Sequence, residues 1–188
     1  MVKYWKYILL TVSGIVLYNI LKAGSMSNKF VRFTNMEALK LLALQSSLTK
    51  VGFKLPQLNF ALAQLLFETG KFTRQSQVAA NNNNYSGIKW INSSRQNATK
   101  GTLVPLGERV SDPNSPLNYY AHFNNMDDWA TDFKRIISLQ RSANNIGKPI
   151  DANTLDQYIH RLKLNQYFGD SENVYYNGAK KYLDMFGT

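Results

Sequence analysis

The sequence predicts an α+β domain that is predominantly helical, contains one small β-hairpin, and is preceded by an N-terminal hydrophobic helix. The helices follow from several stretches in which apolar residues recur at helical spacing. The hairpin follows from two short apolar and aromatic segments, residues 102–106 and 117–123, separated by a polar stretch with Gly and Pro. With 188 residues and 44% hydrophobic content, the chain can bury one core, so we expect one domain over residues 35–188.

The N-terminal helix is expected because residues 7–21 form an uncharged, mostly apolar run. At ~1.5 Å per residue, this run spans roughly 22 Å, against about 30 Å for the hydrocarbon core of a bilayer. Three interpretations remain: a signal anchor over residues 1–25, a cleavable signal peptide ending near residues 23–25, and a buried helix. We favour the membrane anchor, followed by a polar linker over residues 26–34.

Two helices are expected at the start of the domain, over residues 35–51 and 56–69. The second is the candidate core helix, because residues 58–67 are almost wholly apolar. Pro56 is suited to the first turn of this helix, and Gly70 is suited to its end. These signals place Glu68 in its last turn.

The middle of the chain, residues 81–102, is rich in Asn, Ser and Gly and is expected to be a loop that leads into the hairpin. Apolar periodicity then predicts three more helices, over residues 127–139, 155–164 and 175–185. Asp151 or Asn153 is the expected cap of the helix over residues 155–164.

Composition excludes several classes of site. The chain has no cysteine, and His122 and His160 belong to no H-E-x-x-H pattern, so we expect no metal. No glycine-rich phosphate loop is present, and we expect no cofactor. The net charge of +10 is spread from Lys3 to Lys181 instead of forming one stripe, which argues against nucleic acid and favours a diffuse attraction to polyanions.

Glu68 is the candidate catalytic residue. Apolar surroundings and the negative end of the helix both raise the pKa of a carboxyl at this place. A carboxylic acid that is still protonated near neutral pH can give a proton to the leaving oxygen of a glycosidic bond. We therefore interpret Glu68 as an acid catalyst. A merely solvated glutamate at a helix end is the simpler alternative.

Two motifs accompany this acid. Glu68 is followed by Thr-Gly-Lys-Phe, and residues 83–89 read Asn-Asn-Tyr-Ser-Gly-Ile-Lys. The pair resembles the signature of the peptidoglycan N-acetylglucosaminidases of glycoside hydrolase family 73, in which E-S-G-x-[WF] precedes N-N-x-F-G-I-K. Ser86 departs from the family's Phe, and Tyr85 supplies an aromatic ring one place earlier. The resemblance implies a lysozyme-like fold and hydrolysis of the β-1,4 bond after N-acetylglucosamine.

The resemblance also implies a second acid on the hairpin. Glu108 and Asp112 are the only acidic residues within 69–126. We prefer Glu108, because Asp112 before Pro113 is explained as a turn residue.

Substrate contacts are expected from the loop and the hairpin, where amides, a cation and aromatic rings suitable for stacking on sugars are concentrated. The candidates are Asn83, Asn84, Tyr85, Gly87, Lys89, Trp90, Tyr119 and Tyr120. Turn formation by the asparagines and ordinary packing of the tyrosines are the alternatives.

The expected partners are peptidoglycan glycan strands and, through residues 1–25, the cytoplasmic membrane, with the domain facing the periplasm or cell wall. A small anchored wall hydrolase also suits a phage lysis or virion component, such as an endolysin. Two other functions remain open. One is a lytic transglycosylase, and the other is a non-catalytic wall-binding or structural protein that retains the fold.

Overall fold

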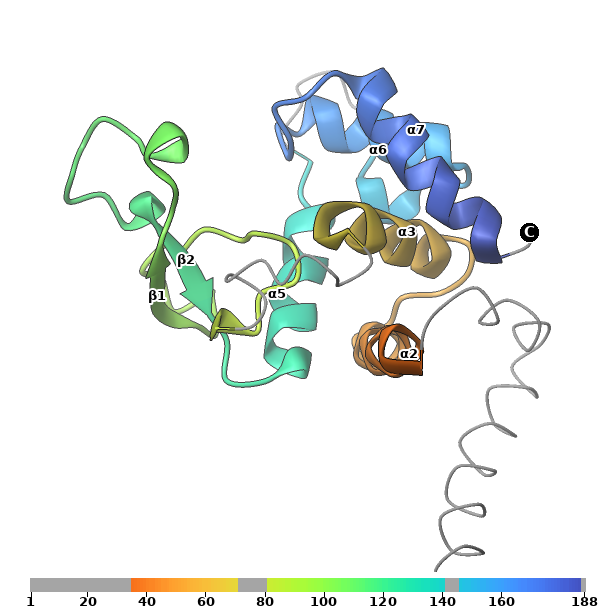
Figure 1. The fold of residues 1–188 in the computed structure, drawn as a ribbon. Coiled ribbons are helices and arrows are strands. Elements are labelled where there is room, and N and C mark those ends of the chain that lie inside the picture. The colour runs from red at the N-terminus through yellow and green to blue at the C-terminus, as the bar shows by residue number, and fades with distance from the viewer. Residues whose placement is uncertain (1–34, 71–80, 141–145, 187–188) are drawn as a thin grey trace, which may run out of the picture.

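The computed structural model describes residues 35–70, 81–140 and 146–186. The predicted α+β class is confirmed, because helices predominate and the described residues contain one two-stranded antiparallel sheet (Figure 1). The N-terminal helix and linker predicted over residues 1–34 lie outside this part of the chain. Within the described ranges, no helix is both long and apolar enough to cross a membrane.

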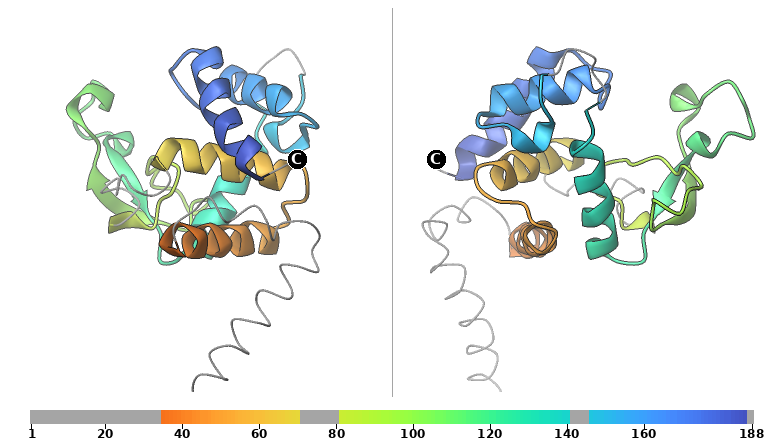
Figure 2. Two further views of the ribbon diagram at one scale, coloured as in Figure 1. Left: turned by 45° about the vertical axis from the view of Figure 1, so that its right-hand side comes forward. Right: turned by 180° about the vertical axis from the view of Figure 1, so that it is seen from behind.

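Helix α3 is the centre of the helical body. The helices are α2 (Asn35–Lys50), α3 (Gln57–Thr69), α5 (Met126–Ile137), α6 (Leu155–Leu164) and α7 (Glu172–Leu183). Helix α3 lies between α2 on one side and the pair α6 and α7 on the other, and α2 also packs against α5 (Figure 2). Residues 58–66 of α3 are all buried. A helix that is hydrophobic nearly all round therefore occupies the core, as its sequence predicts.

The ends of α3 are set by the two residues that the sequence singles out. Pro56 precedes the first turn. Gly70 adopts a left-handed conformation with φ 55°, and its N–H donates to the carbonyl oxygens of Leu66 and Phe67. This conformation favours glycine, which pays no Cβ penalty there. The helix stops at this point, and Glu68 is held in its last turn.

The sheet pairs β1 (Thr99–Leu103) with β2 (Tyr119–His122). The first strand was expected over residues 102–106, but it begins at Thr99 and ends at Leu103. Pro105 has no N–H for a ladder, and a 3₁₀ turn follows at Leu106–Glu108. Residues 104–118, here called the arm, continue beyond the strands and project from the body (Figure 1).

Two helix starts differ from expectation. Helix α6 is capped by Thr154, whose side chain accepts from the Gln157 N–H, and not by Asp151 or Asn153. Asp151 belongs instead to the 3₁₀ turn Pro149–Asp151. Helix α7 begins at Glu172 rather than at residue 175, because the Ser171 side chain accepts from the Val174 N–H and caps it there.

Candidate active site

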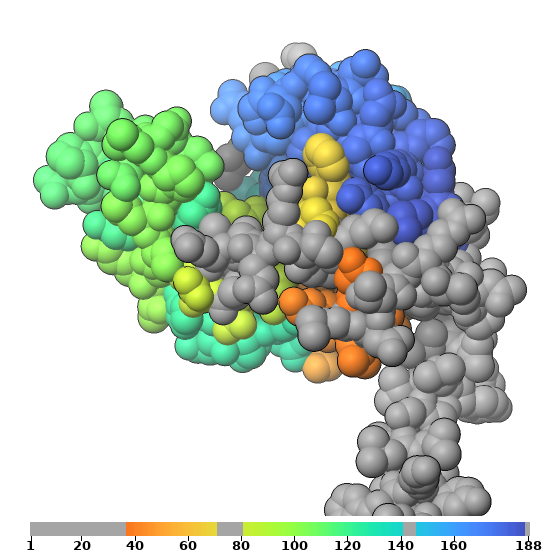
Figure 3. Space-filling model, viewed as in Figure 1, coloured from red at the N-terminus to blue at the C-terminus, as the bar shows by residue number. Residues whose placement is uncertain are grey.

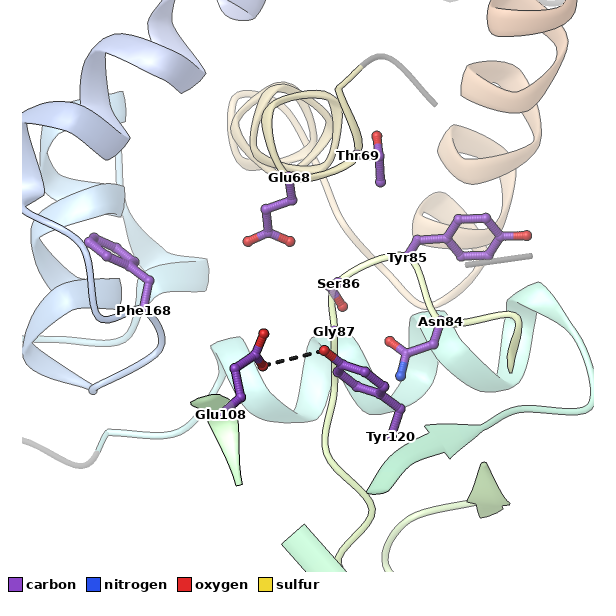
Figure 4. A pocket seen from close by; sticks show the side chains of 9 residues that line it. All are labelled: Glu68, Thr69, Asn84, Tyr85, Ser86, Gly87, Glu108, Tyr120 and Phe168. Atoms are coloured by element: carbon purple, nitrogen blue, oxygen red, sulfur yellow. Dashed lines mark hydrogen bonds between the residues drawn. The ribbon is translucent and has the colours of Figure 1, made fainter. Parts of the chain in front are cut away.

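A cleft of about 400 Å³ lies where the end of α3, the Asn-rich loop, the arm and the turn between α6 and α7 meet. The arm (green) and the C-terminal helices (blue) stand on opposite sides, with α3 (yellow) between them (Figure 3). The lining residues are Glu68, Thr69, Asn84, Tyr85, Ser86, Gly87, Glu108, Tyr120 and Phe168. Both predicted acids are among them, and their carboxyl groups enter the cleft from opposite sides (Figure 4).

Glu68 has the shifted pKa that its position predicts. Burial raises the pKa of its carboxyl from 4.5 to about 7. Hydrogen bonds from Tyr175, Gln64 and Tyr167 favour the carboxylate and lower the pKa, but they do not cancel the effect of burial. At neutral pH, a substantial fraction of Glu68 therefore carries a proton, as a general acid must.

The side chains that hold Glu68 come from three elements. The Tyr175 hydroxyl of α7 donates to Glu68 Oε1, and Gln64 Nε2 of α3 donates to the same oxygen at 3.0 Å. Phe168, in the turn before α7, stacks on the Tyr175 ring at 3.9 Å between centroids. Sequence reasoning missed these residues. For Gln64 a signal existed, because it is a polar residue in an apolar helix, four places before Glu68 and hence on the same face.

Glu108 has a different environment. Its Oε2 accepts from Lys89 Nζ at 2.7 Å and from the Tyr120 hydroxyl at 3.3 Å, and the side chain is 53% exposed. Burial, followed by the negative charge of Glu108, raises the pKa of Tyr120 to about 12. Tyr120 therefore stays a hydrogen-bond donor near neutral pH. The cleft thus has an enclosed acid on one wall and an ion-paired carboxylate on the other.

Two asparagines, Asn83 and Asn84, connect the Asn-rich loop to the sheet and to the residue that follows it. Asn84 is 1% exposed, and its Nδ2 donates to the carbonyl oxygens of Ile88 at 2.8 Å and Ala121 at 3.0 Å. Asn83 adopts a left-handed conformation with φ 47°, and its Nδ2 donates to the Phe123 carbonyl at 2.9 Å. These contacts agree with the alternative that the asparagines shape the turn instead of binding the substrate. Asn84 lines the cleft while it fixes the loop.

The predicted contact residues divide into two groups. Asn84, Tyr85, Gly87 and Tyr120 line the cleft, whereas Asn83, Lys89, Trp90 and Tyr119 lie outside its lining. Lys89 instead pairs with Glu108, and Lys100 Nζ covers the Tyr119 ring at 3.7 Å. Trp90 is partly buried and packs against the core. The lining residues that sequence reasoning missed are Thr69, Ser86 and Phe168.

Asp112 lies outside the cleft lining. Its Oδ1 accepts from the Asn114 N–H at 2.9 Å, and its carbonyl oxygen accepts from the Ser115 N–H at 3.1 Å. These bonds close a local turn, so the interpretation of Asp112 as a turn residue is confirmed.

Among the residues that the structure describes, no three His, Asp or Glu side chains gather as a metal-ligand set. Comparison of the chain with protein-family models, curated proteins and solved structures gives no match. Function is therefore inferred from the motifs and from the chemistry of the cleft.

Proposed function

We propose that the chain is a peptidoglycan hydrolase, an endo-β-N-acetylglucosaminidase that resembles glycoside hydrolase family 73 and has a lysozyme-like domain. It would cleave the β-1,4 bond after N-acetylglucosamine. The observation that carries this proposal is the enclosed carboxyl of Glu68, with its pKa raised to about 7, in a cleft whose opposite wall bears Glu108. Two carboxyl groups that flank a scissile bond are the usual machinery of glycoside hydrolysis.

The two acids would share the reaction according to their environments. Glu68 enters protonated and gives its proton to the glycosidic oxygen, while the bonding pair of the anomeric C–O bond moves to that oxygen. Positive charge develops at the anomeric carbon. Glu108 either stabilises that charge or accepts a proton from the attacking water, and water completes a new reducing end. Glu68 is left as a carboxylate and recovers a proton from solvent.

The remaining lining residues suit a sugar polymer. Tyr120 and Phe168 line the cleft, and sugar rings pack on aromatic faces. The Tyr85 ring points away from the two acids and packs edge to face against Trp129 (Figure 4). The Asn84 amide is occupied by backbone, so its contribution is to hold the loop in place. The net charge of +10 adds long-range attraction to the carboxylates and anionic polymers of a bacterial wall.

A lytic transglycosylase is the second candidate. It is favoured by the state of Glu108, which is half-exposed and bound to Lys89. Of the two acids that line the cleft, Glu68 alone is enclosed, and a transglycosylase uses one acid and closes an anhydro sugar without water. A non-catalytic wall-binding protein would need the cleft but not the shifted pKa of Glu68.

The deciding experiment is digestion of purified cell walls, with identification of the new chain ends by mass spectrometry. New reducing-end N-acetylglucosamine supports the proposal. Anhydro-muramic ends identify a transglycosylase, and reducing-end N-acetylmuramic acid places the cut at the other bond. Binding to walls without any new ends identifies a non-catalytic protein.

A further inference from the structure

The two carboxyl oxygens of Glu68 differ in their surroundings. Oε1 accepts two hydrogen bonds, one from the Tyr175 hydroxyl and one from Gln64 Nε2 at 3.0 Å. Oε2 has almost no exposed surface and no partner within hydrogen-bond distance, although the Tyr167 hydroxyl is near enough to the carboxyl to lower its pKa. A buried polar atom without a partner costs free energy unless a ligand satisfies it. Of the two carboxyl oxygens, Oε2 is therefore the one with capacity left to carry a proton.

The donors at Oε1 have fixed directions. The Tyr158 hydroxyl donates to Gln64 Oε1 at 2.6 Å, which leaves the Gln64 amide nitrogen to face Glu68. Burial raises the pKa of Tyr158 and Tyr175 well above the usual tyrosine value, so both hydroxyls keep their protons. With two hydrogens directed at Oε1, a third on that oxygen would be repelled. The proton of the neutral acid belongs on Oε2.

We propose that Tyr175 is a positioning residue that, with Gln64, makes Oε1 of Glu68 the acceptor oxygen and so directs the transferable proton onto Oε2, toward the glycosidic oxygen. This inference rests on the proposed function. In the reaction the Oε2–H bond breaks, the proton goes to the glycosidic oxygen, and the resulting carboxylate keeps its Tyr175 and Gln64 hydrogen bonds at Oε1. The same two bonds therefore serve the acid before and after the proton leaves.

The Tyr175 hydroxyl is held in place by the packing of its ring against two other aromatic rings. Phe168 stacks on it with the ring planes 6° apart, and Phe67 meets it edge to face at 5.2 Å. Its helix approaches α3 closely at Gly178, where a Cβ would lie 2.2 Å from the Phe67 ring. The donor is thus placed by the contact between two helices rather than by a free side chain.

Several titratable groups act on Glu68 from the elements packed around it. They are Tyr158 from α6, Tyr167 from the turn after α6 and Tyr175 from α7. Glu108 is the charged group on the opposite wall of the cleft. Tyr175 is the hydrogen-bond donor with the largest lowering effect on the pKa of Glu68.

The test variant is Tyr175→Phe, which removes the hydroxyl but keeps the ring between Phe168 and Phe67. Turnover of soluble peptidoglycan fragments should fall roughly 10- to 100-fold with KM nearly unchanged, because the acid loses its orientation and not its substrate contacts. Since the lost bond favours the carboxylate, the alkaline limb of the pH–rate profile should move to higher pH. Tyr176→Phe, which alters the next residue of the same helix, is the matched control and should leave both quantities unchanged.

A second measurement does not depend on activity. The pKa of Glu68 is followed in the full-length protein by NMR titration of its carboxyl carbon, assigned by its absence in Glu68→Gln. In Tyr175→Phe this pKa should lie above the wild-type value. An unchanged pKa, or a fall toward 4.5 as general loosening admits water, would overturn the inference.

The two measurements separate this inference from the proposed function. If wild-type protein cleaves walls and neither turnover nor the Glu68 pKa responds to Tyr175→Phe, only the positioning role of Tyr175 is lost. If wild-type protein cleaves nothing while the pKa rises as expected, the proposed reaction is lost and the Tyr175–Glu68 contact is upheld.

Discussion

At Glu68, burial and hydrogen bonding act on one carboxyl in opposite directions, and burial dominates. A fully solvated glutamate would be ionised at neutral pH and unable to donate. A buried one without donors would be too weak an acid to release its proton readily. Tyr175 and Gln64 moderate the rise, so that the pKa settles at about 7, near the pH at which a general acid is most effective.

The shifted pKa makes stability depend on pH. The folded state holds the Glu68 proton up to about pH 7, whereas the unfolded chain releases it near 4.5. The stabilisation of the folded state by this proton is fully present below the unfolded pKa of 4.5. It is lost as the pH rises through the folded pKa of about 7. Between about pH 5 and about pH 8, the thermal unfolding midpoint of Glu68→Gln should therefore fall less than that of wild type. Parallel pH profiles for the two proteins would contradict the raised pKa.

The two acids on the arm have different roles, so removing the charge of each should affect turnover differently. Glu108→Gln should lower turnover by roughly 10²-fold, because the carboxylate at the cleft wall is lost. Asp112→Asn should change turnover little, since the amide oxygen can still accept from the Asn114 N–H and hold the turn. Initial rates of wall clearing check both variants, with unfolding midpoints as the control for folding. A reversed order would exchange the roles. Indifference to both would favour either a substrate whose acetamido group replaces the second carboxylate or the transglycosylase.

At the scale of elements, local signals predicted most of the helical framework. The ends of α3 follow from Pro56 and Gly70, and α6 was predicted with the bounds that it has. The N-capping residues were harder to predict, because several polar residues precede each helix and the backbone geometry decides which one caps it. Thr154 caps α6, and Ser171 caps α7.

The sequence predicted the site residues that lie in local motifs and missed those that reach the site through the packing of helices. Glu68 and the asparagine loop lie in recognisable motifs, and Glu108 follows from the scarcity of acids near the hairpin. Tyr175, on which Phe168 stacks, reaches Glu68 only because α7 packs along α3. That contact joins residues about a hundred positions apart, and no local periodicity encodes it.

The packing of α7 on α3 can be tested at Gly178. Gly178→Ala would put a Cβ 2.2 Å from the Phe67 ring, so either that ring or α7 must shift. We expect a loss of about 1–3 kcal/mol in the free energy of unfolding, together with reduced turnover because α7 carries Tyr175. Gly169→Ala is the matched control, since no heavy atom lies within 4 Å of its added Cβ. Chemical denaturation of both variants checks the prediction, and equal stabilities would contradict it.

At the scale of the whole molecule, the end of α3, the Asn-rich loop, the arm and the turn between α6 and α7 build one cleft between the arm and the helical body (Figure 3). The chain as a whole carries a net charge of +10, which favours anionic surroundings. The proposed wall substrate exists only outside the cytoplasm, so we expect the domain to be exported or held facing the wall.

The apolar run over residues 7–21, which lies outside the described residues, predicts how the domain is held. In cells that express the full chain, the protein should fractionate with the cytoplasmic membrane and be digested by protease added from outside. Full-length protein found only in the soluble cytoplasm would contradict the anchor. A mature N-terminus at Met26 would replace the anchor with a cleaved signal peptide.

The most direct test of the central claim, that Glu68 is the acid of a wall-cleaving enzyme, is the rate at which Glu68→Gln releases new chain ends from purified walls. The rate should fall by roughly 10³-fold, because the amide keeps the shape of the side chain but has no proton to give. Circular dichroism and the unfolding midpoint establish that the variant is folded. A folded Glu68→Gln protein that releases ends at the wild-type rate would contradict the assignment.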